Sequence, residues 1–273
     1  MGMVVQHNMT AANANRMLGV TTSAQAKSSE KLSSGYRINR AGDDAAGLKI
    51  SEKMRSQIRG LDKASDNAQD GISLIQTAEG ALSESHSILQ RMNELAVQGA
   101  NDTNESIDRD AINEELTALT SELDRIASTT QFNTQNLLDG KFTGKNLQVG
   151  ALKDQKISIS IKTMNADALS VNALDVASFG AAGSAMKKIQ KAIDKVSSQR
   201  SNLGALQNRL EHTVNNLDNV AENTQTAESR IRDTDMASEM VQYSATSIIQ
   251  QAGQSMLAQA NSQTPVSYTH LRA

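Results

Sequence analysis

The sequence contains no cysteine and no tryptophan, and it has one proline, three tyrosines and three phenylalanines among its 273 residues. Without cysteine, the chain can form neither disulfides nor thiolate metal sites. Aromatic side chains usually supply much of a core's buried area, so their scarcity argues against a thick, many-layered interior. The remaining apolar residues, mostly Ala, Leu, Ile, Val and Met, suit close-packed helices and favour a thin helical bundle.

Long apolar runs and clusters of one charge are also missing. No segment approaches the ~20 apolar residues that a membrane-spanning helix requires. The 27 Lys and Arg residues are scattered among 30 Asp and Glu residues, which leaves no basic patch of the kind that binds nucleic acid. Residues 1–8 lack the basic and apolar regions of a secretory signal, so composition alone indicates a cytoplasmic protein. We therefore expect neither a membrane nor a nucleic-acid partner.

Two series of apolar residues repeat at every seventh position, one in each half of the chain. Heptads sustained over this length predict long helices that pack side by side as a coiled coil. No proline precedes Pro265, and helices of ~50 residues would each extend ~75 Å. The expected fold is mainly α, an elongated antiparallel helical bundle or coiled-coil rod. Its predicted core positions are Met54, Leu61, Ile75, Leu82, Leu89, Ile189, Val196, Leu203, Leu210, Leu217 and Ile231.

Two shorter elements are predicted between the long helices. A stripe of apolar residues over positions 112–126 indicates a third helix, with Asp102 and Glu105 as its capping pair. The segments Leu147–Val149 and Lys156–Lys162 are separated by turn residues, and isoleucines alternate along the second one. This pattern predicts a small, half-buried β-hairpin.

The two ends of the chain, residues 3–40 and 236–264, also have a helical pattern, but Ala, Ser, Gln, Asn and Met dominate them. Their apolar stripes are thin, and a lone helix with so narrow an apolar face cannot offset its ordering entropy. We expect the two ends to pair with each other, to be disordered in a free monomer, and to gain structure only against copies of the chain. That profile is typical of a self-assembling subunit.

No pattern in the sequence points to an enzyme. Asp43 and Asp44 are explained as acids at the start of a helix, where they complement its dipole. The Ser33–Gly35 segment lacks the strand–turn–helix context of a nucleophile elbow. We expect no catalytic residue, no cofactor site and no metal site. The four histidines show no mutual ligand spacing; they are His7, His86, His212 and His270.

Several segments resemble motifs of the bacterial flagellin family, in the family's order and over nearly all of residues 3–265. In the first half they are LSSGYRIN (32–39), DDAAGL (43–48), QRMNELAVQ (90–98), and QFN followed by LLDG (131–140). In the second half they are QRSNLGALQNRL (199–210), AESRIRDTDMASEM (227–240) and QQAGQSMLAQAN (250–261). The resemblance implies a structural subunit that polymerises into the flagellar filament for motility.

The resemblance also implies a division into domains. Residues 1–43 and 236–273 would form the inner-tube terminal helices, and residues 44–235 the surrounding rod domain with its hairpin. The connection Asn165–Gly183 is short, so the outer variable domains of the family would be absent. The tail Val266–Ala273 lacks the short Leu-rich run that usually completes the family's inner helix.

The partners that the resemblance implies are mainly flagellar. The chain would form a helical homopolymer with itself and would contact the filament cap and junction proteins. An export chaperone would hold its C-terminal helix. The subunit would leave the cell through the type III export channel without a cleaved signal peptide, and would be found in the extracellular filament.

The resemblance implies one host partner, Toll-like receptor 5, which would bind the monomer. Arg91 would offer a two-pronged guanidinium to the receptor, and Leu95 would fill the middle of the contact patch. Asn93 stands where many strongly recognised flagellins have a second arginine. The matching positions are Gln90, Arg91, Leu95, Ile112 and Glu115.

Three other interpretations remain open. A hook–filament junction protein has similar terminal helices but forms one ring, so copy number separates it from a filament subunit. A cytoplasmic signalling coiled coil would continue its heptads to both ends and need no β-hairpin. An enzyme is the least favoured, and a saturable substrate would reveal it.

Overall fold

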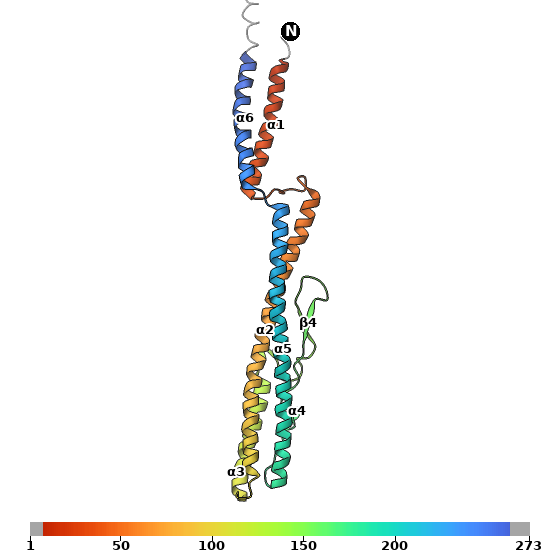
Figure 1. Ribbon diagram of the computed structural model, residues 1–273, viewed down its shortest axis with the longest axis vertical. Helices are drawn as coiled ribbons and strands as arrows, with labels where there is room; N and C mark the ends of the chain where they lie inside the picture. Colours follow the sequence, from red (N-terminus) through yellow and green to blue (C-terminus); the bar gives the residue numbers. More distant parts are fainter. Residues whose placement is uncertain (1–7, 263–273) are drawn as a thin grey trace, which may run out of the picture. The chain divides into compact units, whose positions relative to one another are not determined.

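The computed structural model describes residues 8–262. The tail Val266–Ala273, the residues before Asn8, and the histidines His7 and His270 therefore lie outside the described residues. Within them the chain is mainly helical, which confirms the predicted fold class (Figure 1). The elements are α1 (Met9–Ser34), α2 (Ala45–Gly99), α3 (Ser106–Thr129), β1 (Gln131–Phe132), β2 (Gln135–Asn136), β3 (Lys145–Gln148), β4 (Lys156–Ile159), α4 (Ala166–Leu169), α5 (Phe179–Arg232) and α6 (Met236–Ser262).

The chain divides into two compact units. The central unit is Gln57–Glu222, and the terminal unit comprises the residues up to Ser56 and those from Asn223 onwards. The boundaries fall inside α2 and α5, so the first turns of α2 and the last turns of α5 group with α1 and α6. The proposed domain boundaries at 43 and 236 follow the loops instead and stay a prediction.

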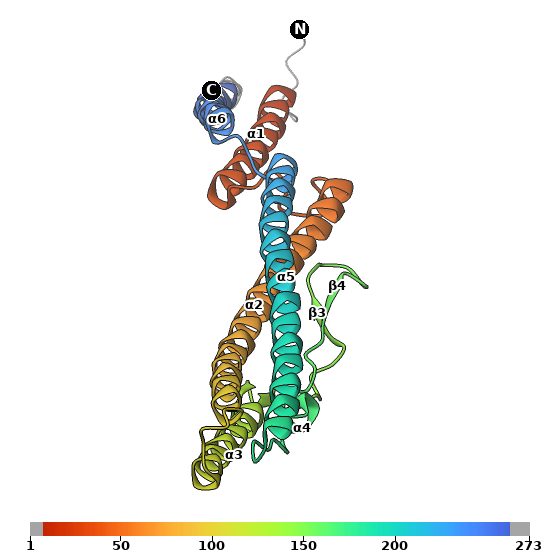
Figure 2. The same cartoon turned by 60° about the horizontal axis from the view of Figure 1, so that its bottom comes forward.

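In the central unit α2, α3 and α5 lie side by side and enclose the core (Figure 2). The heptad positions of this unit are all buried: Leu61, Ile75, Leu82, Leu89, Ile189, Val196, Leu203, Leu210 and Leu217. Leu61 and Leu217 pack in a separate small cluster with Ala64. Met54 and Ile231 belong to the terminal unit and are half-buried. Neither helix contains proline, so α2 continues without a break over 55 residues and α5 over 54.

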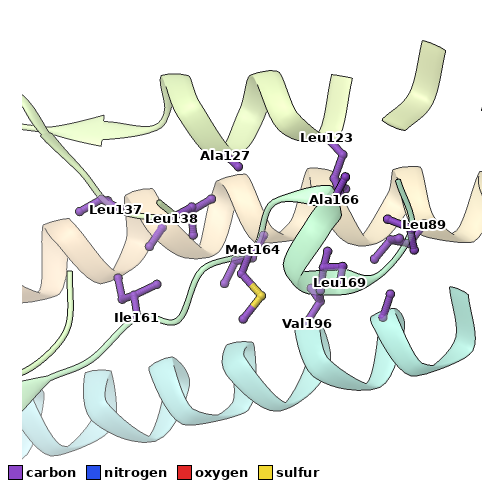
Figure 3. Packing of buried hydrophobic residues seen from close by; sticks show 14 of the residues in the cluster. Leu89, Leu123, Ala127, Leu137, Leu138, Ile161, Met164, Ala166, Leu169 and Val196 are labelled. Atoms are coloured by element: carbon purple, nitrogen blue, oxygen red, sulfur yellow. The ribbon is translucent and has the colours of Figure 1, made fainter. Parts of the chain in front are cut away.

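The segment that follows α3 fills the space between the three helices (Figure 3). Leu137, Leu138 and Ile161 are fully buried there, and Met164 and Leu169 lie beside Val196 of α5. The backbone N–H of Ala166 donates to the Asp124 carboxylate of α3 at 2.8 Å, which fixes α4 against that helix. A segment rich in small residues thus contains a short packed helix where the sequence indicated only a connection.

The predicted hairpin is present as the antiparallel pair β3–β4, in which Lys145 pairs with Ile159 and Gln148 with Lys156. Ile157 and Ile159 are buried and their neighbours exposed, because alternate side chains of a strand point to opposite faces. A second, smaller pair, β1–β2, was not predicted. Its turn holds Asn133 and Thr134 at positive φ, which sequence alone does not reveal for threonine.

Two predicted helix ends are corrected by the structure. α1 stops at Ser34, short of residue 40, because Gly35 adopts the left-handed conformation and its N–H donates to the Lys31 carbonyl at 2.8 Å. α3 begins at Ser106, and its capping box joins Glu105 to Asp108. Asp102 does not cap this helix; its carboxylate pairs with Arg109 at 3.1 Å.

Candidate assembly surfaces

α1 and α6 pair antiparallel within the terminal unit. The Asn8 side-chain amide donates to the Ala260 carbonyl at 2.9 Å near one end, and Lys31 pairs with Glu239 at 3.4 Å near the other. Between them, a Cβ on Gly253 would lie 3.3 Å from the end of the Leu18 side chain, so the two helices approach closely there. This arrangement confirms the predicted pairing of the two chain ends.

The pair buries very little of its own surface. Ser28 is the one buried residue of α1 and Thr246 the one buried residue of α6, within the described part of the chain. Fifteen large hydrophobic side chains are exposed in residues 8–262, and nine of them belong to these two helices. These nine, the terminal apolar surface, are Met9, Met17, Val20, Met236, Met240, Val241, Ile248, Ile249 and Met256.

α6 also carries almost no charge. Glu239 is its one charged residue, and that carboxylate is already paired with Lys31. Exposed apolar side chains without neighbouring charges mark a surface that another protein surface covers. The terminal apolar surface therefore has the chemistry of an assembly interface.

A cluster around Tyr36 fixes the chain where it leaves α1. The guanidinium of Arg232 lies 4.7 Å and that of Arg55 5.9 Å from the centre of the Tyr36 ring, within the range of cation–π attraction. The Thr234 N–H donates to the Gly35 carbonyl at 3.0 Å, which binds the two chain ends backbone to backbone. This cluster was not predicted from the sequence. Tyrosine is rare in the chain, and that rarity was the one feature of the sequence that could have drawn attention to Tyr36.

Asp43 stabilises the loop that leads into α2. Its carboxylate accepts hydrogen bonds from the backbone N–H groups of Arg40 at 3.0 Å and Asn39 at 3.2 Å. These two bonds, the one to Arg40 first, lower the pKa of Asp43 below its ordinary value. Asp44 instead accepts from the Gly47 N–H at 2.9 Å, as an acid at a helix start does.

The residues proposed for receptor contact divide into two groups. Gln90, Arg91 and Glu115 are exposed on α2 and α3. Arg91 donates from Nε to Glu115 at 3.0 Å and from Nη1 to Glu94 at 3.3 Å, so it links the two helices. The hydrogen bond to Glu115, and then that to Glu94, raises the pKa of Arg91 above its ordinary value.

Leu95 and Ile112 are not surface residues. Leu95 is 2% and Ile112 6% exposed, and both belong to the core of the central unit. The reason is that α3 covers a second face of α2, beside the heptad seam. The expectation that Leu95 fills the middle of a contact patch is therefore wrong for the chain in this conformation.

No grouping of residues in the described part of the chain suggests chemistry. Within residues 8–262, no three His, Asp or Glu side chains come together as they would around a metal ion. The helices of the same range include none that is long and apolar enough to cross a membrane.

Comparison with known proteins gives two matches to family models. Residues 5–143 match the bacterial flagellin N-terminal helical region, and residues 186–268 match the bacterial flagellin C-terminal helical region. Together these ranges contain α1, α2 and α3 on one side and most of α5 with α6 on the other.

Individual proteins resemble the chain along nearly its whole length. It is 56% identical to a flagellin of Halalkalibacterium halodurans over 263 residues, which cover 96% of this chain and 97% of that protein. It is 52% identical to a flagellin of Bacillus subtilis, again over 96% and 97% of the two chains. A solved structure described as a flagellar hook-associated protein from Vibrio parahaemolyticus shares the fold, with a TM-score of 0.59 and 13% identity, over 70% of this chain and 100% of that one.

Proposed function

The chain belongs to the bacterial flagellin family and is a structural subunit of the flagellar filament, and from this premise we propose that the α1–α6 pair holds the filament together. The observation that carries the proposal is the terminal apolar surface on two helices that bury only Ser28 and Thr246 between them. Residues 1–43 and 236–273 would line the inner tube, and residues 44–235 would form the rod around it. Copies of the chain would cover the surface that the monomer leaves exposed.

Seeded assembly tests this proposal. Short filament seeds are added to the intact chain, to a chain lacking residues 236–273, and to the double variant Val241→Ser, Ile248→Ser. We expect long filaments by negative-stain microscopy from the intact chain alone. The two substituted side chains are 71% and 67% exposed, so the variant should keep the monomer's circular dichroism spectrum. Normal filaments from the double variant would refute the role of the terminal apolar surface.

The same surface supports a proposal for export. We propose that a flagellar chaperone covers α6 until the subunit passes through the export channel to the extracellular filament, where it meets the cap and junction proteins. A helix with one charged residue and six exposed large apolar side chains would otherwise assemble or aggregate in the cytoplasm. Co-expression should therefore yield a soluble complex with the intact chain and none with the chain lacking residues 236–273.

Recognition by Toll-like receptor 5 is proposed through the exposed residues Gln90, Arg91 and Glu115. Arg91 is half exposed, and two neighbouring carboxylates hold its planar guanidinium group in place. Arg91→Ala should weaken receptor signalling by monomer at least about tenfold. Arg125→Ala is the matched control, because Arg125 forms a comparable pair with Glu122 farther along α3. Equal effects of the two substitutions would count against this site.

The hook–filament junction remains the second candidate, because the hook-associated structure shares the fold. A likeness at 13% identity supports the fold alone, whereas the flagellin relatives exceed 50% identity. Long filaments from the intact chain would settle the choice for a filament subunit. We propose no catalytic role.

A further inference from the structure

A hollow opens beneath the turn of the β3–β4 hairpin, entirely within the central unit. Its volume is ≈ 480 Å³, and its apolar lining includes Leu61 of α2, Val149 and Leu152 of the hairpin, and Leu217 of α5. Leu152 is 66% exposed, so the hairpin turn leaves an apolar side chain at the mouth of the hollow. The lining thus offers a place for an apolar side chain from outside.

Two cations stand at the rim of this hollow. Arg209 of α5 and Lys156 of β4 are exposed, and neither side chain forms an ion pair with any residue of the range 8–262. Asp154 is the one carboxylate of the lining. The rim therefore favours a partner that carries negative charge around an apolar side chain.

The start of α3 has the complementary features. Ile107 is 74% exposed, more than any other large hydrophobic residue described. Four carboxylates flank it, at Asp102, Glu105, Asp108 and Asp110. The single arginine among them, Arg109, donates to the carbonyls of Ala177 at 3.0 Å and Asn101 at 3.3 Å. It also pairs with Asp102 at 3.1 Å, which leaves the carboxylates of Glu105, Asp108 and Asp110 beside Ile107.

We propose that Ile107 of one copy inserts into the hollow beneath the hairpin turn of the next copy, with Asp110 and its neighbouring carboxylates facing Arg209 and Lys156. The inference rests on the proposed function, because it assigns one contact of the assembled filament. Each site combines apolar side chains with charges, and the charges of the two sites are opposite in sign. Because the chain assembles with copies of itself, the partner is present at high local concentration.

The positions of the two sites exclude a contact within one copy. The hollow lies beside α2 near Gly60, where a Cβ would meet Ala151, and α3 begins next to the end of α2 at Gly99. A rise of 1.5 Å per residue separates these two glycines by roughly 58 Å along α2. Ile107 of one copy therefore cannot reach the hollow of the same copy. A contact between different patches on successive copies builds an open filament when the rotation between copies does not close, and the number of copies that can be linked distinguishes this case from a closed pair.

Cysteine cross-linking tests the contact directly, because the natural chain has no cysteine. The double variant Ile107→Cys, Leu152→Cys changes two exposed side chains, and a disulfide within one copy is impossible across such a distance. Oxidised filaments of this variant should give a ladder of dimers, trimers and higher oligomers on a non-reducing gel. Dilute monomer should give none, and each single variant should give dimers at most.

A charge exchange provides the second test. Asp110→Arg and Arg209→Glu should each raise the critical concentration for seeded growth about tenfold. The chain with both substitutions should have a critical concentration within about threefold of that of the natural chain. The mismatched pair Glu84→Arg, Arg209→Glu should not restore it, since Glu84 lies elsewhere on α2.

The outcomes separate this inference from the function on which it rests. If the double-cysteine chain forms filaments without a ladder, or if the charge exchange is not restored, the contact is refuted while the filament function stands. If the natural chain forms no filaments from seeds, the proposed assembly itself fails, and the contact fails with it.

Discussion

At the scale of single residues, glycines of α2 show how closely the hairpin approaches that helix. A Cβ added at Gly60 would lie 2.9 Å from the Cβ of Ala151 and 3.4 Å from its Cα, and neither atom can rotate away. An added Cβ at Gly80 would meet nothing within 4 Å. Gly80→Ala should therefore raise the free energy of unfolding by about 1 kcal/mol, the usual gain in a helix interior. Gly60→Ala should fall short of that gain by about 1–3 kcal/mol, because the hairpin turn must shift.

Urea unfolding followed by circular dichroism measures this difference, since both substitutions lie in α2 and share the same helix gain. Equal stabilisation by the two substitutions would show that the hairpin turn moves without cost. If Gly80→Ala lowered the free energy of unfolding, the exposed face of α2 around Gly80 would have to be packed against a neighbour that the free chain does not show.

Asp43 provides a pH-dependent prediction at the same scale. Its pKa is lowered in the folded chain by the N–H groups of Arg40 and Asn39. A lowered pKa means that the ionised carboxylate stabilises the loop. This stabilisation is complete above the unfolded pKa of about 3.9, and it is lost as the pH falls through the lower pKa of the folded chain. We expect the side-chain carbonyl carbon of Asp43 to titrate below pH 3.9 by NMR.

The amides of Asn39 and Arg40 should report the same event, moving with pH only while Asp43 is present. In Asp43→Asn these two amide signals should no longer titrate in acid. A titration of Asp43 at or above its ordinary value would contradict the geometry of the two hydrogen bonds.

At the scale of elements, the helices should differ greatly in local stability. α1 and α6 each bury one small polar residue, whereas α2 and α5 bury many apolar side chains along their length. Local opening is easy where few apolar contacts are lost. In dilute monomer, amides of α1 and α6 should exchange at least ~100-fold faster than central amides of α2 and α5. Filament formation should protect them, and slow exchange in monomer would refute the expected disorder of free ends.

The elements also show how far the sequence alone could predict the structure. The heptads predicted both long helices, because a seven-residue apolar repeat has few other structural solutions. They could not show that α3 covers a second face of α2. The family resemblance placed Leu95 and Ile112 in a surface contact patch, although Ile112 also belongs to the apolar stripe predicted for the third helix, and the structure buries both. A single stripe identifies one packed face, and a second one has to be found from residues such as Leu95 that lie outside the repeat.

Helix starts were less predictable for a related reason. Asp102 and Glu105 have the spacing of a capping pair, but Glu105 and Asp108 have it too, and the sequence does not rank them. Which of the two pairs caps the helix depends on Arg109, whose guanidinium contacts Asp102 and the carbonyls of Asn101 and Ala177. Two of these three contacts are local, but the third joins segments far apart in the chain. The Tyr36 cluster escaped prediction for the same reason, since Arg55 and Arg232 come from opposite halves of the sequence.

At the scale of the whole molecule, the balance of charge and apolar surface predicts how assembly responds to salt. α6 has one charged residue, and that residue is already paired, so screening has little to weaken on the terminal apolar surface. Sulfate strengthens apolar burial because it is excluded from protein surfaces, and cooling weakens it. The contribution of the terminal apolar surface to filament growth should therefore depend on the kind of salt, whereas the proposed contact between Asp110 and Arg209 should respond to ionic strength.

Seeded growth in sodium sulfate and sodium chloride at matched ionic strength tests this prediction, with sedimentation giving the critical concentration. At matched ionic strength we expect the critical concentration in sulfate to be several-fold lower than in chloride, because both salts screen equally while sulfate alone strengthens burial. Cooling from 25 °C to 5 °C should raise it in either salt. If the two salts act alike, ion pairs would govern assembly, and the apolar side chains of α1 and α6 would be exposed for some other purpose.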